Sequence, residues 1–178
     1  MTAATSEASA RPDDSGMRVV PALPGLDPRW SRLVVAPDAD GVERRWHVLD
    51  TGAPEGEQLG TMLCVHGNPT WSYMWRRFLA AARPGWRVVA VDQLGMGYSE
   101  DPAGTLSQPR TLAQRIEDLT RLTDALGLTG PVVAVGHDWG GIVVSGWAAR
   151  HRNAGSGAPD RPDGPVTAGL VLANTAVH

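Results

Sequence analysis

The sequence has little of what would identify several classes of protein. It contains a single cysteine, Cys64, which excludes an internal disulfide and a cysteine-rich metal site. No apolar run approaches the roughly 20 residues that a membrane-spanning helix needs. Lysine and arginine form no block, and the net charge is −3 with a sequence pI near 5.9. These values argue against nucleic acid or an anionic membrane as a partner.

What remains is the composition of an ordinary globular protein. The 178 residues are 42% hydrophobic and 20% charged, which suits about one domain. Residues 1–20 are rich in alanine, serine and threonine and lack an apolar segment, so we expect a disordered tail and not a signal peptide. A cytoplasmic location is then the default expectation. Cys64 lies in an apolar run and is interpreted as a small buried core residue.

Residues 21–178 alternate between strand-like and helix-like patterns. Short apolar or β-rich runs predict strands over 31–36, 42–49, 61–65, 86–91, 131–135 and 166–173. Apolar residues at helical spacing predict helices over 71–82, 112–126 and 140–152. The segment 153–165 is rich in glycine, proline and aspartate, so we expect a flexible surface loop there.

Local signals refine this assignment at four places. The charges of Glu43 to Arg45 predict an edge or half-exposed strand. Thr70 is a candidate N-cap for the first helix. Thr111 and Gln114 have the spacing of a capping box for the second helix, which Gly127 would end.

Strands alternating with helices predict an α/β fold with a mostly parallel sheet and helices on both faces. Binding sites in such sheets lie at the carboxyl ends of the strands. Three glycine-containing turns follow predicted strands, at 66–70, 92–99 and 136–141. We expect these turns to meet at one edge of the sheet.

The third turn carries the most informative pattern. The apolar strand Pro131–Val135 bends through Gly136 and Gly140 into an apolar helix, with Asp138 at the apex. Glycines two residues either side of one reactive residue are typical of a strained nucleophile turn. A carboxylate at the apex is a poor catalyst for acyl transfer but a competent nucleophile on carbon. The alternative is that Asp138 merely caps the helix that follows it.

Three stretches together resemble the signature motifs of haloalkane dehalogenases, which lie beside the epoxide hydrolases in the α/β-hydrolase superfamily. They read HGNPTWSYMWR at 66–76, DQLGMGYS at 92–99 and GHDWGG at 136–141, in the same order as in that family. The resemblance implies the α/β-hydrolase fold. Residues 21–178 would form its N-terminal part, with the first six strands but without the cap and the last strands.

The resemblance also implies roles for individual residues. Asp138 would attack an sp³ carbon of a small apolar substrate, and a histidine-activated water would then cleave the alkyl ester. The backbone N–H groups of Asn68 and Trp139 would hold the oxyanion. The Asn68 amide and the Trp139 indole would also donate to a departing halide. No metal and no cofactor are implied.

Other polar residues near these turns are interpreted as structural. His66 is expected to hydrogen-bond its loop, and the side chain of His137 should leave the turn on a different side from Asp138. Asp92 is expected to tie its own turn by hydrogen bonds. Phosphate binding at 95–97 is disfavoured, because the stretch lacks a third glycine and a following helix of the phosphate-binding type. Gly67, Gly136 and Gly140 are expected to shape the backbone around the site.

The family's catalytic histidine and its partner acid would come later than His178. We therefore expect the 178 residues at most to become alkylated and to keep the ester. An epoxide hydrolase is one alternative, which Asn68 and the run WSYMW at 71–75 disfavour. A β-lactone-processing enzyme is another, and no residue separates it from a dehalogenase. The last alternative is a non-catalytic binding protein with a hydrolase fold.

Overall fold

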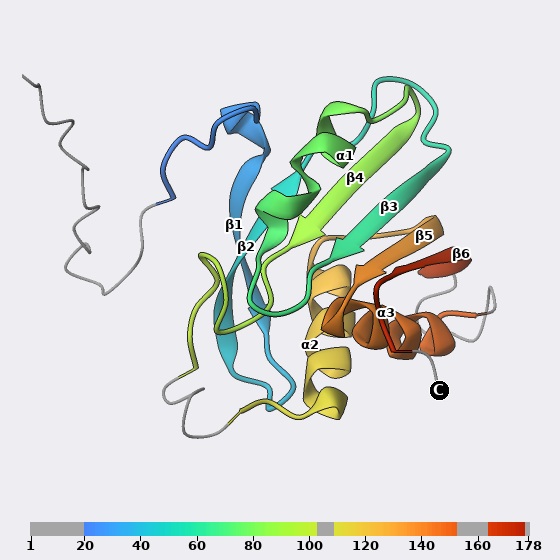
Figure 1. Ribbon diagram of the computed structural model, residues 1–178. Helices are drawn as coiled ribbons and strands as arrows, with labels where there is room; N and C mark the ends of the chain where they lie inside the picture. Colours follow the sequence, from blue (N-terminus) through green and yellow to red (C-terminus); the bar gives the residue numbers. More distant parts are fainter. Residues whose placement is uncertain (1–19, 103–108, 153–163, 177–178) are drawn as a thin grey trace, which may run out of the picture.

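A computed structural model describes residues 20–102, 109–152 and 164–176 of the chain (Figure 1). The predicted tail at 1–20 and the predicted loop at 153–165 lie almost wholly outside the described residues. The six strands are β1 Ser31–Pro37, β2 Glu43–Asp50, β3 Gly60–Val65, β4 Trp86–Val91, β5 Gly130–His137 and β6 Pro165–Ala173. The helices are α1 Arg76–Ala80, α2 Leu112–Ala125 and α3 Trp139–Arg150, with short 3-10 turns η1 Pro28–Trp30 and η2 Ser72–Trp75.

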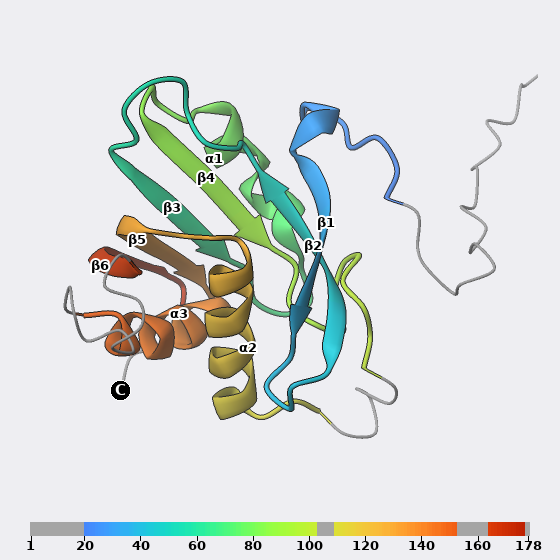
Figure 2. The same cartoon turned by 180° about the vertical axis from the view of Figure 1, so that it is seen from behind.

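The strands form one sheet in the order β1-β2-β4-β3-β5-β6. The pairs β3–β4, β3–β5 and β5–β6 are parallel, whereas β2 is antiparallel to both β1 and β4. Helix α1 lies on one face of this sheet, and α2 and α3 lie on the other (Figures 1 and 2). The predicted mostly parallel sheet, covered on both faces, is confirmed.

Of the two alternatives for 42–49, the edge strand is wrong, because β2 lies between β1 and β4 and β1 forms the edge. The half-exposed strand is confirmed for the charged start of β2, where Glu43 is exposed and Arg44 and Arg45 are half-buried. Of the charges that suggested an edge, Arg44 is closely ion-paired. The Arg44 guanidinium donates to Asp38 and to Glu100, each at 2.9 Å. An ion-paired arginine can therefore sit on an inner strand near its end.

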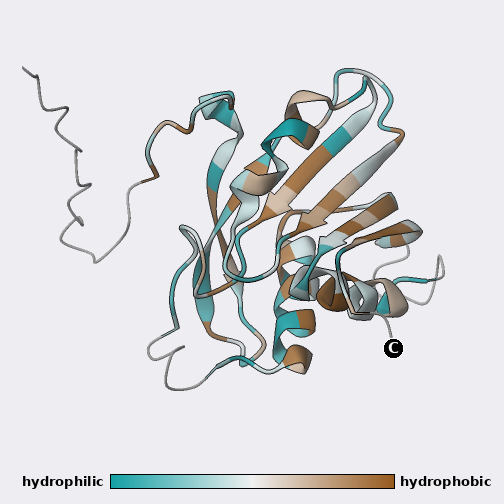
Figure 3. Ribbon diagram, in the orientation of Figure 1, coloured by the Kyte–Doolittle hydropathy of each residue, from teal (hydrophilic) through white to brown (hydrophobic). Residues whose placement is uncertain are grey.

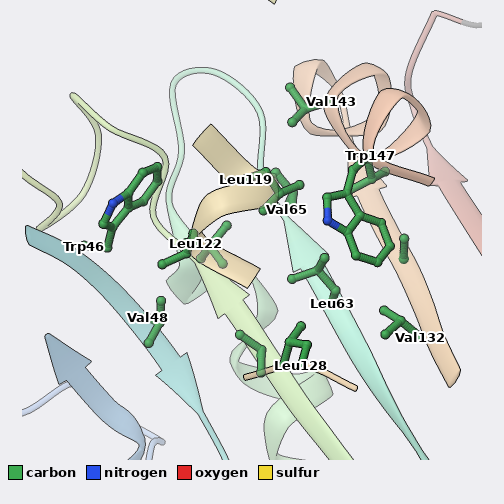
Figure 4. Close-up of a cluster of buried hydrophobic side chains, with 14 of the residues drawn as sticks. Trp46, Val48, Leu63, Val65, Leu119, Leu122, Leu128, Val132, Val143 and Trp147 are labelled. Carbon is green, nitrogen blue, oxygen red and sulfur yellow. The ribbon is translucent and has the colours of Figure 1, made fainter. Parts of the chain in front are cut away.

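Alternate residues of the central strands build two apolar layers. On the α2/α3 face, Leu63 and Val65 pack with Leu122 and Trp147 in the larger cluster (Figure 4). On the α1 face, Cys64 packs in a smaller cluster, and the central strands are the most hydrophobic part of the fold (Figure 3). Burial raises the pKa of the Cys64 thiol, so the prediction of a buried, unreactive core cysteine is confirmed.

The first predicted helix differs from what the structure shows. Residues 71–82 hold the 3-10 turn η2 followed by the single short helix α1, and Thr70 is not the N-cap. The N–H of Ser72 donates to the Asp92 carboxylate at 2.7 Å. The Asp92 carboxylate, which follows β4, thus accepts the hydrogen bond that an N-cap side chain would accept. No local sequence pattern could indicate this contact.

The second helix follows its prediction closely. The Gln114 N–H donates to the Thr111 hydroxyl at 3.3 Å, and the Thr111 N–H donates to the Gln114 side chain at 3.0 Å. This reciprocal pair is the predicted capping box. Gly127 follows the helix with φ of +62°, a value that favours glycine.

Among the described strands β6 is the other edge of the sheet. Its consecutive residues Leu170 and Val171 point to opposite faces and are 42% and 49% exposed. Apolar side chains are therefore exposed on both faces of the sheet at β6. No helix in the described parts of the chain is long and apolar enough to cross a bilayer.

Candidate active site

Asp138 lies at the sharp bend between β5 and α3. Its backbone has φ of 53° and ψ of −128°, a conformation that costs a non-glycine residue about 1–3 kcal/mol. The Asp138 N–H donates to the Ala173 carbonyl at 3.2 Å, and its carbonyl accepts from the Gly141 N–H at 2.9 Å. The side chain makes no capping bond to α3, so the structure does not support the helix-cap interpretation.

The loop after β3 faces the Asp138 carboxylate. The Asn68 N–H donates to Asp138 Oδ2 at 2.9 Å. The N–H groups of Trp139 and Asn68 hold the pKa of the Asp138 carboxyl below its usual range. A Cβ on Gly67 would lie 2.8 Å from the Asp138 Cγ, so a glycine is needed where the loop and the side chain approach.

The two predicted backbone donors therefore converge on one carboxylate. The side chains of the same residues are more open, since Asn68 is exposed and Trp139 is 48% exposed. Gly140 lets α3 begin against the end of β3, because a Cβ there would lie 2.7 Å from the Val65 carbonyl carbon. Gly136 is equally constrained, with a Cβ 2.5 Å from the Gly141 Cα.

His66 is buried and ties two of the three turns together. Its Nδ1 donates to the Gly67 carbonyl at 2.8 Å, and its Nε2 accepts from the Gln93 N–H at 3.1 Å. The Gln93 side chain donates back to the His66 carbonyl at 2.6 Å. Burial lowers the pKa of His66, and both ring nitrogens are engaged, so the loop-bonding prediction is confirmed.

Asp92 is buried and ties its turn to neighbouring elements. Its carboxylate accepts from the Ser72 N–H at 2.7 Å, the Tyr98 N–H at 2.8 Å and the His47 Nδ1 at 2.8 Å. Burial opposes the charge, but the hydrogen bonds from His47, Ser72 and Tyr98 outweigh it and keep the pKa of Asp92 low. The predicted structural role of Asp92 is confirmed.

His137 is the last residue of β5. Its Nδ1 is buried and has no hydrogen-bond partner among the described residues. In the strand it alternates with Gly136, on the face where Val135 joins the smaller cluster. No contact places its ring on the Asp138 carboxylate.

The sequence analysis assigned no role to three residues around this site. His47 hydrogen-bonds Asp92 from β2, and Gln93 hydrogen-bonds His66 from the turn after β4. Thr175 donates its hydroxyl to the Asp138 carbonyl at 2.7 Å. No spacing rule links these residues to their partners, because each bond joins segments more than 25 residues apart.

The chain is similar in sequence to curated enzymes. Over 107 residues the chain is 41% identical to a cis-3-alkyl-4-alkyloxetan-2-one decarboxylase of Xanthomonas campestris, covering 58% of this chain. Over 111 residues it is 39% identical to a haloalkane dehalogenase of Sphingobium indicum, covering 61% of this chain. The match covers 35% of the length of each of these relatives.

A solved structure is similar as well. An epoxide hydrolase from an endophytic Streptomyces superposes with a TM-score of 0.57 at 29% identity, covering 81% of this chain and 37% of that one. Residues 60–168 match the family model described as the alpha/beta hydrolase fold. This match spans three of the elements that bear the site, namely the ends of β3, β4 and β5. The chain therefore belongs to the α/β-hydrolase fold family.

Proposed function

We propose that Asp138 is a nucleophile that forms a covalent ester with an electrophilic carbon of a small apolar substrate. One observation carries the proposal: a carboxylate with a lowered pKa stands at a strained bend, facing two backbone N–H donors. The strained backbone destabilises the fold, and among the described residues the two N–H groups have no other hydrogen-bond partner that would explain their placement. Such arrangements cluster at functional sites.

The chemistry follows from what each group can do. Asp138 attacks the carbon, the bond to the leaving group breaks, and the leaving group departs with the bonding electrons. One carboxylate oxygen becomes the ester carbonyl oxygen, which the N–H groups of Asn68 and Trp139 are placed to hold as charge develops on it. The Asn68 amide and the Trp139 indole, both open to the site, would receive a departing halide.

Cleaving an alkyl ester would need a base that activates water. His66 does not supply one, because both of its ring nitrogens are bonded to the backbone. His47 is held between Asp92 and the Ser31 hydroxyl, 2.8 and 2.9 Å from its two ring nitrogens. We therefore propose that the described residues alone carry the reaction of an alkyl halide as far as the ester.

A β-lactone is the second candidate substrate, and the 41% identity to an oxetan-2-one decarboxylase favours it. Attack of Asp138 on the sp³ ring carbon would break its bond to the ring oxygen and leave a carboxylate. Loss of CO₂ from that carboxylate would form the alkene and expel the Asp138 carboxylate unchanged. This sequence consumes no water, so it needs no added base.

Intact-protein mass spectrometry tests the proposal. With 1-bromobutane we expect a butyl adduct on Asp138, located by peptide mapping, together with one bromide released per protein. Asp138→Asn should give no adduct, whereas the exposed carboxylate variant Glu55→Gln should label like the wild type. An adduct on another residue would refute the nucleophile.

A cis-3,4-dialkyloxetan-2-one should be tested in parallel. Alkene and CO₂ released at more than one equivalent per protein would identify the lactone reaction. Adduct formation with bromobutane alone would favour the dehalogenase-like reaction. If neither probe reacts with the wild type, the chain is better explained as a binding protein that has the hydrolase fold.

A further inference from the structure

Residues 173–175 hold the backbone of Asp138 from both sides. The Ala173 carbonyl accepts the Asp138 N–H at 3.2 Å, and the Thr175 hydroxyl donates to the Asp138 carbonyl at 2.7 Å. Between them Asn174 has a φ of 44°, at a bend in the chain. Two residues of one short segment thus fix the two peptide groups that flank the apex.

The bond from Thr175 reaches the site through the peptide plane. The Asp138 carbonyl and the Trp139 N–H belong to the same planar, trans peptide group, so they point in opposite directions. Fixing the carbonyl oxygen therefore fixes the direction of the Trp139 N–H. That N–H is one of the two that lower the pKa of the Asp138 carboxyl.

A glycine makes room for this contact. A Cβ on Gly141 would collide with the Thr175 hydroxyl and lie 2.5 Å from its Cβ. Side chains at that position would push Thr175 away from the carbonyl that it binds. The Gly141 N–H donates to the same carbonyl at 2.9 Å, so the helix start and the hydroxyl share one acceptor.

We infer that Thr175 is a positioning residue: its hydroxyl orients the Asp138–Trp139 peptide group and so keeps the Trp139 N–H aimed at the Asp138 carboxylate. The inference rests on the proposed function, because it assigns Thr175 to the proposed oxyanion donor. Thr175 does not touch substrate. Its effect passes through the backbone of the bend.

The test is the titration of the Asp138 carboxyl, followed by ¹³C NMR in labelled protein. Thr175→Val removes the hydroxyl at nearly constant shape, and we expect it to raise the pKa of Asp138 by about one unit, since one charge-stabilising donor turns away. Thr175→Ser keeps a hydroxyl and should titrate like the wild type. The resonance of Asp50, which is bonded to Arg87 and Arg32, should not move in any variant.

Thr167→Val is the matched control. Thr167 also donates its hydroxyl to a backbone carbonyl, that of Ala148 at 3.2 Å, from the other end of β6. Its replacement should lower the urea midpoint as much as Thr175→Val does but leave the Asp138 titration unchanged. Gly141→Ala should displace Thr175 and shift the titration in the same direction as Thr175→Val, which keeps the test open if one variant folds poorly.

The inference is overturned if Thr175→Val titrates like the wild type, or if Thr175→Ser or Thr167→Val shifts the Asp138 pKa equally. The titration does not depend on covalent reaction at Asp138. A wild type that is never alkylated, together with a shifted titration in Thr175→Val, would refute the proposed nucleophile and leave the positioning role standing. Normal alkylation of the wild type, together with an unshifted titration in Thr175→Val, would support the nucleophile and refute the positioning role.

Discussion

Two aspartates follow the parallel strands β4 and β5, which flank β3 in the sheet, and their surroundings are opposite. Asp92, after β4, is buried and receives hydrogen bonds from His47, Ser72 and Tyr98. Asp138, after β5, is partly exposed and faces the N–H groups of Asn68 and Trp139. Both carboxyl groups have pKa values below the usual range, so charge alone does not distinguish them.

The difference lies in what each carboxylate can still do. Every donor to Asp92 comes from a different element, so its hydrogen bonds join β2, the turn η2 and the 92–99 turn. Its burial leaves no path for an incoming carbon. The Asp138 carboxylate faces only N–H groups of its own bend and of the loop after β3, and it stays open to an approaching electrophile. The Asp92 carboxylate stabilises the turns at the carboxyl ends of the strands, and the Asp138 carboxylate is available for chemistry.

Replacing the open carboxylate should give the largest effect on reactivity. Asp138→Asn should abolish adduct formation with 1-bromobutane, because an amide is not a nucleophile of comparable strength. The free energy of unfolding should change by less than about 0.5 kcal/mol, since asparagine tolerates a positive φ. Mass spectrometry and urea unfolding measure the two quantities on the same sample. A large loss of stability would mean that Asp138 is structural after all.

Replacing the buried carboxylate should give the largest effect on stability. Asp92→Asn puts an NH₂ group among three donors, and we expect a loss of about 3 kcal/mol in the free energy of unfolding. Urea unfolding measures the loss. A loss below that of Asp138→Asn would contradict the contrast between the two sites.

Lowering the pH should reduce the free energy of unfolding in two separate steps, the first from His66 and the second from Asp92. The folded pKa of His66 is lowered by burial, so the unfolded chain binds a proton first as the pH falls below about 6.5. Stability should therefore fall between about pH 7 and the folded pKa, by up to about 1.4 kcal/mol per pH unit. His66→Gln should flatten this part of the urea midpoint curve.

A second loss should begin lower. The folded pKa of Asp92 is depressed, so its contribution is complete above the ordinary aspartate pKa of about 3.9 and disappears as the pH falls through the folded value. Adduct formation at Asp138 should persist to a pH below about 3.9 for the same reason, as long as the chain stays folded. A loss of the adduct centred at pH 5 or above would contradict the lowered pKa.

The smallest effect concerns strain at the bend. Asp138→Gly should be more stable than Asp138→Ala by about 1 kcal/mol, because glycine adopts φ of 53° without steric cost. The opposite order is expected inside α3, where the free energy of unfolding of Ser145→Ala should exceed that of Ser145→Gly by about 1 kcal/mol. Equal stability of the two variants at Asp138 would mean that the bend is not strained.

Most of the fold could be predicted from local patterns. All six strands begin and end within two residues of their predicted bounds. The four parallel strands were predictable because short apolar runs between turn residues are typical of buried parallel strands, and β1 and β2 because turn residues separate them. The capping box of Thr111 and Gln114 was predictable for the same reason, since both partners lie three residues apart. The first helix was overestimated in length because its start depends on Asp92, 20 residues away in the chain.

The candidate site divides in the same way. The motifs indicated Asp138, Asn68 and Trp139, and the structure brings the backbone groups of the last two to the carboxylate of the first. The motifs gave no role to His47, Gln93 or Thr175, which hydrogen-bond Asp92, His66 and Asp138 from other segments. Such residues carry no spacing signal, because a hydrogen bond between distant segments depends on how the strands pack.

The amino-acid sequence by itself determined the strand and helix pattern, the glycines of the bend and the residue at its apex. These are local matters, decided by side-chain period and by which residues tolerate a positive φ. Only the tertiary structure decided that Asp92 is buried and that Asp138 is partly exposed. That choice depends on which donors meet each carboxylate: those from β2 and η2 meet Asp92, and one from the loop after β3 meets Asp138. They meet only after the sheet has assembled.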